Sequence, residues 1–136
     1  FYHTGYSEGL TDEERKKAEA IWETRDGGHA CEWETSLFMA CCPGKVKLEY
    51  APKQPVKPLN RFRHLRELGI HNALWWYADF PENVTGDASR ASEEKGRAIM
   101  DIYVKALASK IRAVKDDTAA PQLQEEFARR VQNKGL

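Results

Sequence analysis

The chain has 136 residues, the length of a single domain, and a globule of this size buries roughly two thirds of the surface that its unfolded chain exposes. Lysine plus arginine and aspartate plus glutamate both number 21, and the two signs are interleaved, which argues against a nucleic-acid partner. No apolar run approaches the roughly 20 residues that cross a bilayer, and the start lacks the pattern of a signal peptide, so the sequence predicts a cytoplasmic protein with no membrane partner.

The N-terminal segment, residues 1–26, is predicted to be helical. Thr11 and Glu14 have the spacing of a capping box, and the acids that follow Thr11 suit the positive end of a helix that runs to about residue 24. Its apolar face is thin. We therefore expect this helix to pack against something outside its own segment or to act as a mobile cover.

A second helix is predicted over residues 32–42, where a Pro-Gly pair should end it. On a regular helix, Glu32 and Glu34 point roughly 200° apart, at 100° per residue. The two carboxylates therefore cannot both face one ligand, and one of them must have a supporting role.

The middle of the chain mixes extended and helical patterns. Residues 46–50 alternate like a short strand, and three prolines predict an extended linker over residues 52–58. A helical turn is expected over residues 60–68. Residues 70–78 read as an extended apolar segment whose adjacent tryptophans face opposite sides, so that one can lie in the core while the other lines a pocket or an interface.

The C-terminal part is predicted to be helical. Residues 92–115 have apolar positions at helical spacing over more than five turns. The tail, residues 116–136, shows a charged helical pattern and is expected to dock on a neighbouring subunit. Because strand and helix signals alternate along the chain, we expect one domain over residues 1–136 of α/β class, with few strands.

The three cysteines are odd in number and lack the C-x-x-C pairs of a zinc knuckle, which predicts reduced thiols. Two interpretations of Cys31 remain open at this point. It borders an active site, or it fills a small buried space.

The segment with the most chemistry is GHACEWETS, residues 28–36. It places the imidazole of His29 within five residues of the carboxylates of Glu32 and Glu34. An imidazole that moves a proton near neutral pH, next to carboxylates that bind a metal or orient a water, is typical of a hydrolytic site. The alternative is a solvated helix start whose acids complement the helix dipole.

Two segments resemble the creatininase (creatinine amidohydrolase) family. GHACEWETS is similar to the family's GHAGExETS segment, and GDASRASEEKG at residues 86–96, preceded by LWWYADF at residues 74–80, is similar to its late GDxxxAxxEKG segment. Together they extend the resemblance over about residues 27–115. The resemblance implies a layered, largely parallel sheet flanked by helices, only part of which this chain supplies.

The resemblance also implies an activity and roles for residues. Members of this family use one or two divalent metals, commonly zinc, manganese or iron, to activate a water against an amide-like C–N bond. The resemblance assigns His29 to proton transfer and to stabilisation of the tetrahedral intermediate. Glu34 would orient the histidine or a metal ligand. Glu32 is a candidate metal ligand or, equally, an acid in the first turn of a helix.

Trp33 and Trp76 are candidate substrate-binding walls, and core packing is the alternative for both. The family's substrates include cyclic amides and keto-inositols, so the expected substrate is a small cyclic amide or carbonyl compound. The competing interpretations are a non-catalytic binding or assembly subunit that keeps the fold, and a small independent domain with local similarity.

Family members are longer and take most metal ligands from a first half with Glu-x-His and Asn-Gly-His segments, which do not occur here. The chain also begins at Phe1 without an initiator methionine. We therefore expect it to be the C-terminal portion of an enzyme that is active only with its N-terminal half, as a separate or cleaved chain, and within a homo-oligomer.

Overall fold

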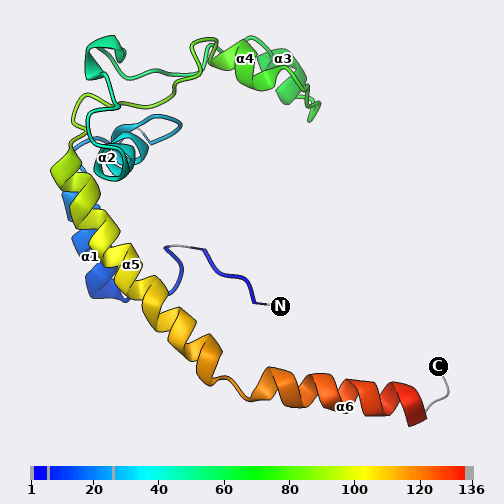
Figure 1. Ribbon diagram of the computed structural model, residues 1–136. Helices are drawn as coiled ribbons and strands as arrows, with labels where there is room; N and C mark the ends of the chain where they lie inside the picture. Colours follow the sequence, from blue (N-terminus) through cyan, green and yellow to red (C-terminus); the bar gives the residue numbers. More distant parts are fainter. Residues whose placement is uncertain (1, 6, 26, 134–136) are drawn as a thin grey trace. The chain divides into compact units, whose positions relative to one another are not determined.

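The computed structural model describes residues 2–5, 7–25 and 27–133. It divides into two compact units, one over Leu10–Ile102 and one that combines Phe1–Gly9 with Tyr103–Leu136. In chain order the elements are α1 (Asp12–Ile21), α2 (Glu32–Cys41), the 3-10 turn η1 (Leu48–Tyr50), α3 (Arg63–Arg66), α4 (Trp75–Asp79), α5 (Glu93–Asp116) and α6 (Ala119–Asn133) (Figure 1).

The predicted α/β architecture with a largely parallel sheet is wrong. Within the described ranges there is no β-strand, and the β pairing is an isolated antiparallel bridge between Val56 and Gly86. The strand expected over 46–50 is replaced by the turn η1, and the segment expected to be extended over 70–78 leads into α4. Short apolar runs do not distinguish a strand from a buried helix, and a strand forms only where a neighbour pairs with its backbone.

The N-terminal helix α1 begins where its sequence predicts. The Oγ1 atom of Thr11 accepts the backbone N–H of Glu14 at 3.2 Å, and the Glu14 carboxylate accepts the Thr11 N–H at 2.8 Å. These bonds satisfy two backbone donors at the helix start. The helix ends at Ile21, three residues earlier than expected, and buries Ala18.

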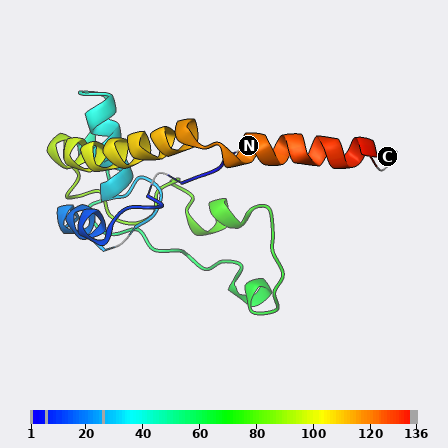
Figure 2. The same cartoon turned by 90° about the horizontal axis from the view of Figure 1, so that it is seen from below.

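Helices α2 and α5 meet at very close range inside the Leu10–Ile102 unit (Figure 2). A Cβ atom added to Gly96 would lie 1.9 Å from the carbonyl oxygen of Ser36. The Ser36 hydroxyl accepts the backbone N–H of Ser92 at 3.1 Å, and both Ser36 and Ile99 are completely buried. Small residues at this crossing let the two backbones touch.

The second unit is built on the C-terminal half of α5 and on α6. Lys110 donates from Nζ to the carbonyl oxygen of Gly5 at 2.9 Å, and the Tyr2 hydroxyl donates to the Asp117 carboxylate. The helices predicted over 92–115 and in the tail are confirmed by α5 and α6. Leu123 and Phe127 on α6 are exposed.

None of the described helices combines the length and the apolar character needed to cross a membrane.

Candidate functional site

The two sequence motifs lie side by side in the structure. The His29 carbonyl accepts the backbone N–H of Thr85 at 2.9 Å, and the Glu32 N–H donates to the Asp87 carbonyl. Gly28 has φ 155°, and a Cβ atom there would lie 2.6 Å from the Thr85 side chain, so glycine is required for this approach. The loop that carries His29 is thereby fixed against the loop that precedes α5.

Glu34 holds the loop and the imidazole together. In the first turn of α2, its Oε2 atom accepts the backbone N–H of Ala30 at 2.8 Å and lies 3.2 Å from Nδ1 of His29. Ala30 adopts φ 60°, which turns the chain sharply before the helix begins. The side chains of His29 and Glu34 are 50% and 40% exposed, so a solute reaches the pair. A carboxylate in this position orients an imidazole through its Nδ1 atom.

Away from Glu34, the His29 ring contacts two residues from the segment before the second motif. The Trp76 ring meets the imidazole in an edge arrangement, with centroids 5.8 Å apart and planes at 73°. The indole Nε1–H donates to Oδ1 of Asn83 at 2.7 Å, and Nδ2 of Asn83 lies 3.5 Å from Nε2 of His29. Asn83 was not predicted as a site residue, because the sequence around a loop asparagine does not show which distant side chains it will meet.

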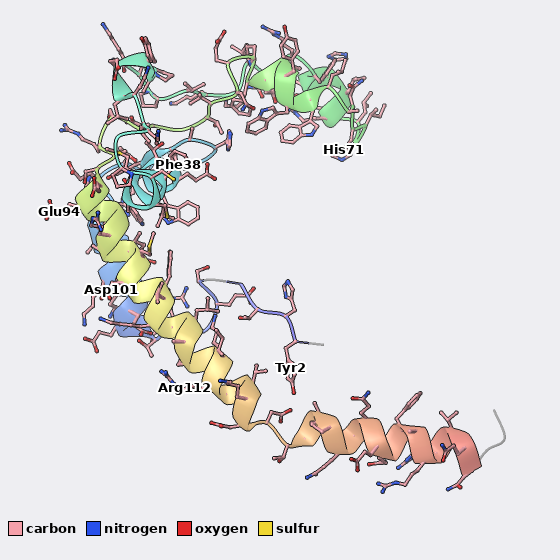
Figure 3. The ribbon with its side chains drawn as sticks, in the orientation of Figure 1. Tyr2, Phe38, His71, Glu94, Asp101 and Arg112 are labelled. Carbon is pink, nitrogen blue, oxygen red and sulfur yellow. The ribbon has the colours of Figure 1, made fainter. Side chains whose placement is uncertain are left out.

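A cavity of about 340 Å³ opens beside the pair. Its polar end is formed by His29 and Glu34, and Phe38, one turn further along α2, contributes an exposed aromatic surface (Figure 3). Ala30, Thr35 and Val46 complete the lining. An apolar wall with a few convergent polar groups is the usual form of a small-molecule site.

Glu32 lies on the opposite side of the helix start and is almost fully buried, at 2% exposure. Its carboxylate accepts the N–H and hydroxyl of Thr24 at 2.6 and 2.7 Å, the N–H of Glu23 at 3.1 Å, and a bond from the Lys95 ammonium. The two glutamates thus have different partners, as the helical angle between them predicts.

Burial raises the pKa of Glu32, but the bond from Lys95 and the bonds from Thr24 and Glu23 outweigh it, and the pKa lies below its ordinary value. Burial also lowers the pKa of Lys95, and the bonds to Glu23 and Glu32 raise it above its ordinary value. Both oxygens of Glu32 are thus occupied by protein donors. This geometry favours the structural interpretation of Glu32, and its role as a metal ligand stays a prediction.

The described residues do not by themselves form a metal centre. Within the described ranges, no group of three or more histidine, cysteine, aspartate or glutamate side chains is placed to hold a metal ion. Zinc sites use three or four protein ligands. His29 and Glu34 offer two donor groups at the cavity, and the imidazole and carboxylate are already directed at each other.

The two candidate substrate tryptophans lie in different places. Trp33 lines a separate cavity of about 240 Å³, together with Glu32 and the buried Cys31. Trp76 is half-buried and packs on Phe80, with ring centroids 4.9 Å apart. Trp76 is therefore adjacent to His29, whereas Trp33 lies in the lining of the cavity that includes Glu32. Their substrate roles stay predictions.

Cys31, Cys41 and Cys42 are all free, and Cys31 is 4% exposed. The burial of Cys31 agrees with the interpretation in which it fills a small interior space. It does not lie among the residues that line the His29 cavity.

A comparison with family models decides between local similarity and membership. The model for creatininase, described as creatinine amidohydrolase, matches residues 4–111. The chain belongs to the creatininase family. The match begins well before residue 27, so it includes α1, which carries no recognisable motif, and it ends within α5, so α6 lies outside it. No curated protein and no solved structure matches the chain. Creatininase-family proteins are in general metal-dependent amidohydrolases.

Proposed function

We propose that this protein is a metal-dependent hydrolase of the creatininase type that acts on a small cyclic amide, or opens a cyclic carbonyl ring such as that of a keto-inositol. The observation that carries the proposal is the contact between His29 and Glu34, at the polar end of an open cavity and within the family's own motif. Family membership supports the reaction class.

In the proposed reaction His29 is the proton carrier. With Nδ1 directed at Glu34, the Nε2 atom is available to take a proton from the attacking water and to deliver it to the leaving nitrogen. The carboxylate of Glu34 stabilises the imidazolium that exists between these two transfers. The same imidazolium would stabilise the negative charge of the tetrahedral intermediate.

The exposed ring of Phe38 supplies the apolar side of the proposed substrate site. A ring compound with one polar edge fits this lining, because its polar edge meets His29 and Glu34 while its face covers the aromatic surface. Trp76 would extend this wall beside His29. These features support a compact cyclic substrate over an extended or highly charged one.

A divalent zinc, manganese or iron ion in such a hydrolase lowers the pKa of a bound water and polarises the carbonyl group. We propose that its ligands come mostly from an N-terminal polypeptide outside this sequence, either separate or cleaved, because the described residues supply too few donors. We also propose that the assembled cytoplasmic enzyme is a homo-oligomer. Glu32 would serve as a ligand only after exchanging its bond to Lys95.

The second candidate is a non-catalytic binding or assembly subunit that keeps the fold. The observation that favours it is the Glu32 carboxylate, whose two oxygens are both occupied by protein hydrogens. In that case the His29 cavity would bind a ligand without converting it.

The test compares His29→Asn with the unsubstituted protein, co-expressed with its partner polypeptide and supplied with metal. The panel of substrates consists of cyclic amides and keto-inositols. We expect near-stoichiometric metal in both proteins and a loss of turnover of about 100-fold or more in the variant. His71→Asn, on a histidine in the loop between α3 and α4, is the matched control (Figure 3). No bound metal and no hydrolysis in the unsubstituted assembly would favour the binding subunit.

A further inference from the structure

The His29 ring has a chain of polar contacts on its Nε2 side that the pair with Glu34 does not explain. The indole of Trp76 donates to the side-chain oxygen of Asn83 at 2.7 Å, and the amide nitrogen of Asn83 lies 3.5 Å from Nε2 of His29. All three side chains belong to the Leu10–Ile102 unit. The ring is therefore bounded by Glu34 at one nitrogen and by Asn83 at the other.

The direction of each contact follows from the chemistry of its groups. An indole N–H only donates, so the atom of Asn83 that faces Trp76 must be the carbonyl oxygen. The group that faces His29 is then the amide NH2, which has two hydrogens and no lone pair to offer. A hydrogen on Nε2 of His29 would oppose that NH2 group, whereas a lone pair on Nε2 would accept from it.

The opposite side of the ring leads to the same tautomer. Nδ1 lies 3.2 Å from Oε2 of Glu34, and an ionised carboxylate accepts but does not donate. The neutral ring therefore carries its hydrogen on Nδ1 and its lone pair on Nε2. This is the form that a proton acceptor at Nε2 requires.

The backbone fits this role for Asn83. Its φ angle is 57°, in the left-handed region, where asparagine is tolerated far better than most residues with a side chain. Trp76 is itself held by Phe80, and its edge contacts the imidazole. The 3.5 Å contact to His29 is long, so the Asn83 amide holds the Nε2 lone pair only weakly and an incoming water can take its place.

We propose that Asn83, oriented by Trp76, fixes the tautomer of His29 with its lone pair on Nε2, and is thereby a positioning residue for the hydrolysis. The significance of this tautomer rests on the function proposed above. The tautomer itself is measured without substrate or metal, so its failure is distinguishable from a failure of the hydrolase proposal.

The test is nitrogen–proton correlation NMR of the histidine-labelled protein near neutral pH, which identifies the protonated nitrogen of each ring. In the unsubstituted protein we expect His29 to carry hydrogen on Nδ1 alone. Asn83→Asp keeps the shape and one acceptor for Trp76, but replaces the NH2 group with an oxygen. We expect Nε2 of His29 to become protonated in this variant.

The matched control is Asn60→Asp, because Asn60 also has φ 57° but its side chain contacts Arg66 and Pro58 and not a histidine. It should leave the His29 signals unchanged. The signals of the other three histidines serve as internal references in every sample.

Trp76→Phe provides a second variant that keeps Asn83 and decides the question if Asn83→Asp does not fold. Without the indole N–H, the Asn83 amide is free to turn its oxygen toward Nε2. Because Glu34 still accepts at Nδ1, we expect part of the His29 population to carry hydrogen on both nitrogens. Hydrogen on Nε2 in the unsubstituted protein would overturn the proposal. The proposal would also be overturned if His29 kept its hydrogen on Nδ1 alone in both folded variants, Asn83→Asp and Trp76→Phe.

Discussion

Two carboxylates two residues apart in one motif have opposite environments. Glu32 is buried, and its oxygens are filled by Thr24, Glu23 and Lys95. Glu34 is partly exposed and faces a histidine beside a cavity. Residue type and proximity in sequence therefore do not assign a chemical role. The role of each glutamate depends on the side of the helix start from which its side chain projects.

The buried side joins the two family motifs into one structural unit. Glu32 and Ser36 of the first motif meet Lys95 and Gly96 of the second, through an ion pair and a backbone contact respectively. The open side carries His29 and the cavity. We therefore expect substitutions on the buried side to change stability and substitutions on the open side to change chemistry.

The largest effect is expected for Gly96→Ala. The added methyl group would lie 1.9 Å from the Ser36 carbonyl oxygen, a backbone atom that cannot move aside by rotation. We expect a loss of about 4 kcal/mol or more in the free energy of unfolding, measured by denaturant titration. Gly27→Ala, where a methyl group meets nothing within 4 Å, is the control and should change little. Equal stability of the two variants would contradict the close contact between α2 and α5.

A smaller loss is expected for Glu32→Gln, which keeps the shape but removes one charge of a buried pair. We expect roughly 2–4 kcal/mol of destabilisation at neutral pH. Because the folded-state pKa of Glu32 lies below its ordinary 4.5, its stabilisation is complete above that pH and is lost as the pH falls through the lower value. The stability curves of the two proteins should therefore converge in acid.

Glu13→Gln is the control for that series, since Glu13 is also a first-turn acid paired with a lysine, but on the exposed surface of α1. Its unfolding midpoint should stay essentially unchanged. A Glu32→Gln protein as stable as this control across the whole pH range would show that the buried pair contributes nothing.

The sequence predicted those features that depend on local pattern. The capping box at Thr11 and the long helix α5 need only short-range spacing, and both are confirmed. The angle between Glu32 and Glu34 follows from helix geometry alone. The family was found from the same two motifs that the structure brings together.

The features that were missed depend on contacts between residues far apart in the chain. Nothing near Glu32 indicates that Lys95, 63 residues later, neutralises it. Asn83 gains its significance from Trp76 and His29, which only the fold brings together. The strands were predicted from the alternation over residues 46–50 and the apolar segment over residues 70–78, and the parallel sheet from the family resemblance. The apolar segment alone did not exclude the short helix that occurs at Trp75–Asp79.

The most direct measurement compares turnover in Glu34→Gln and Glu32→Gln, each assembled with its partner polypeptide and metal, at a temperature where both are folded. We expect Glu34→Gln to retain the stability of the unsubstituted protein and to lose about 100-fold or more in kcat. Glu32→Gln, once folded, should retain most of its turnover. Full activity in Glu34→Gln, with activity and bound metal lost in folded Glu32→Gln, would contradict the assignment of the two carboxylates.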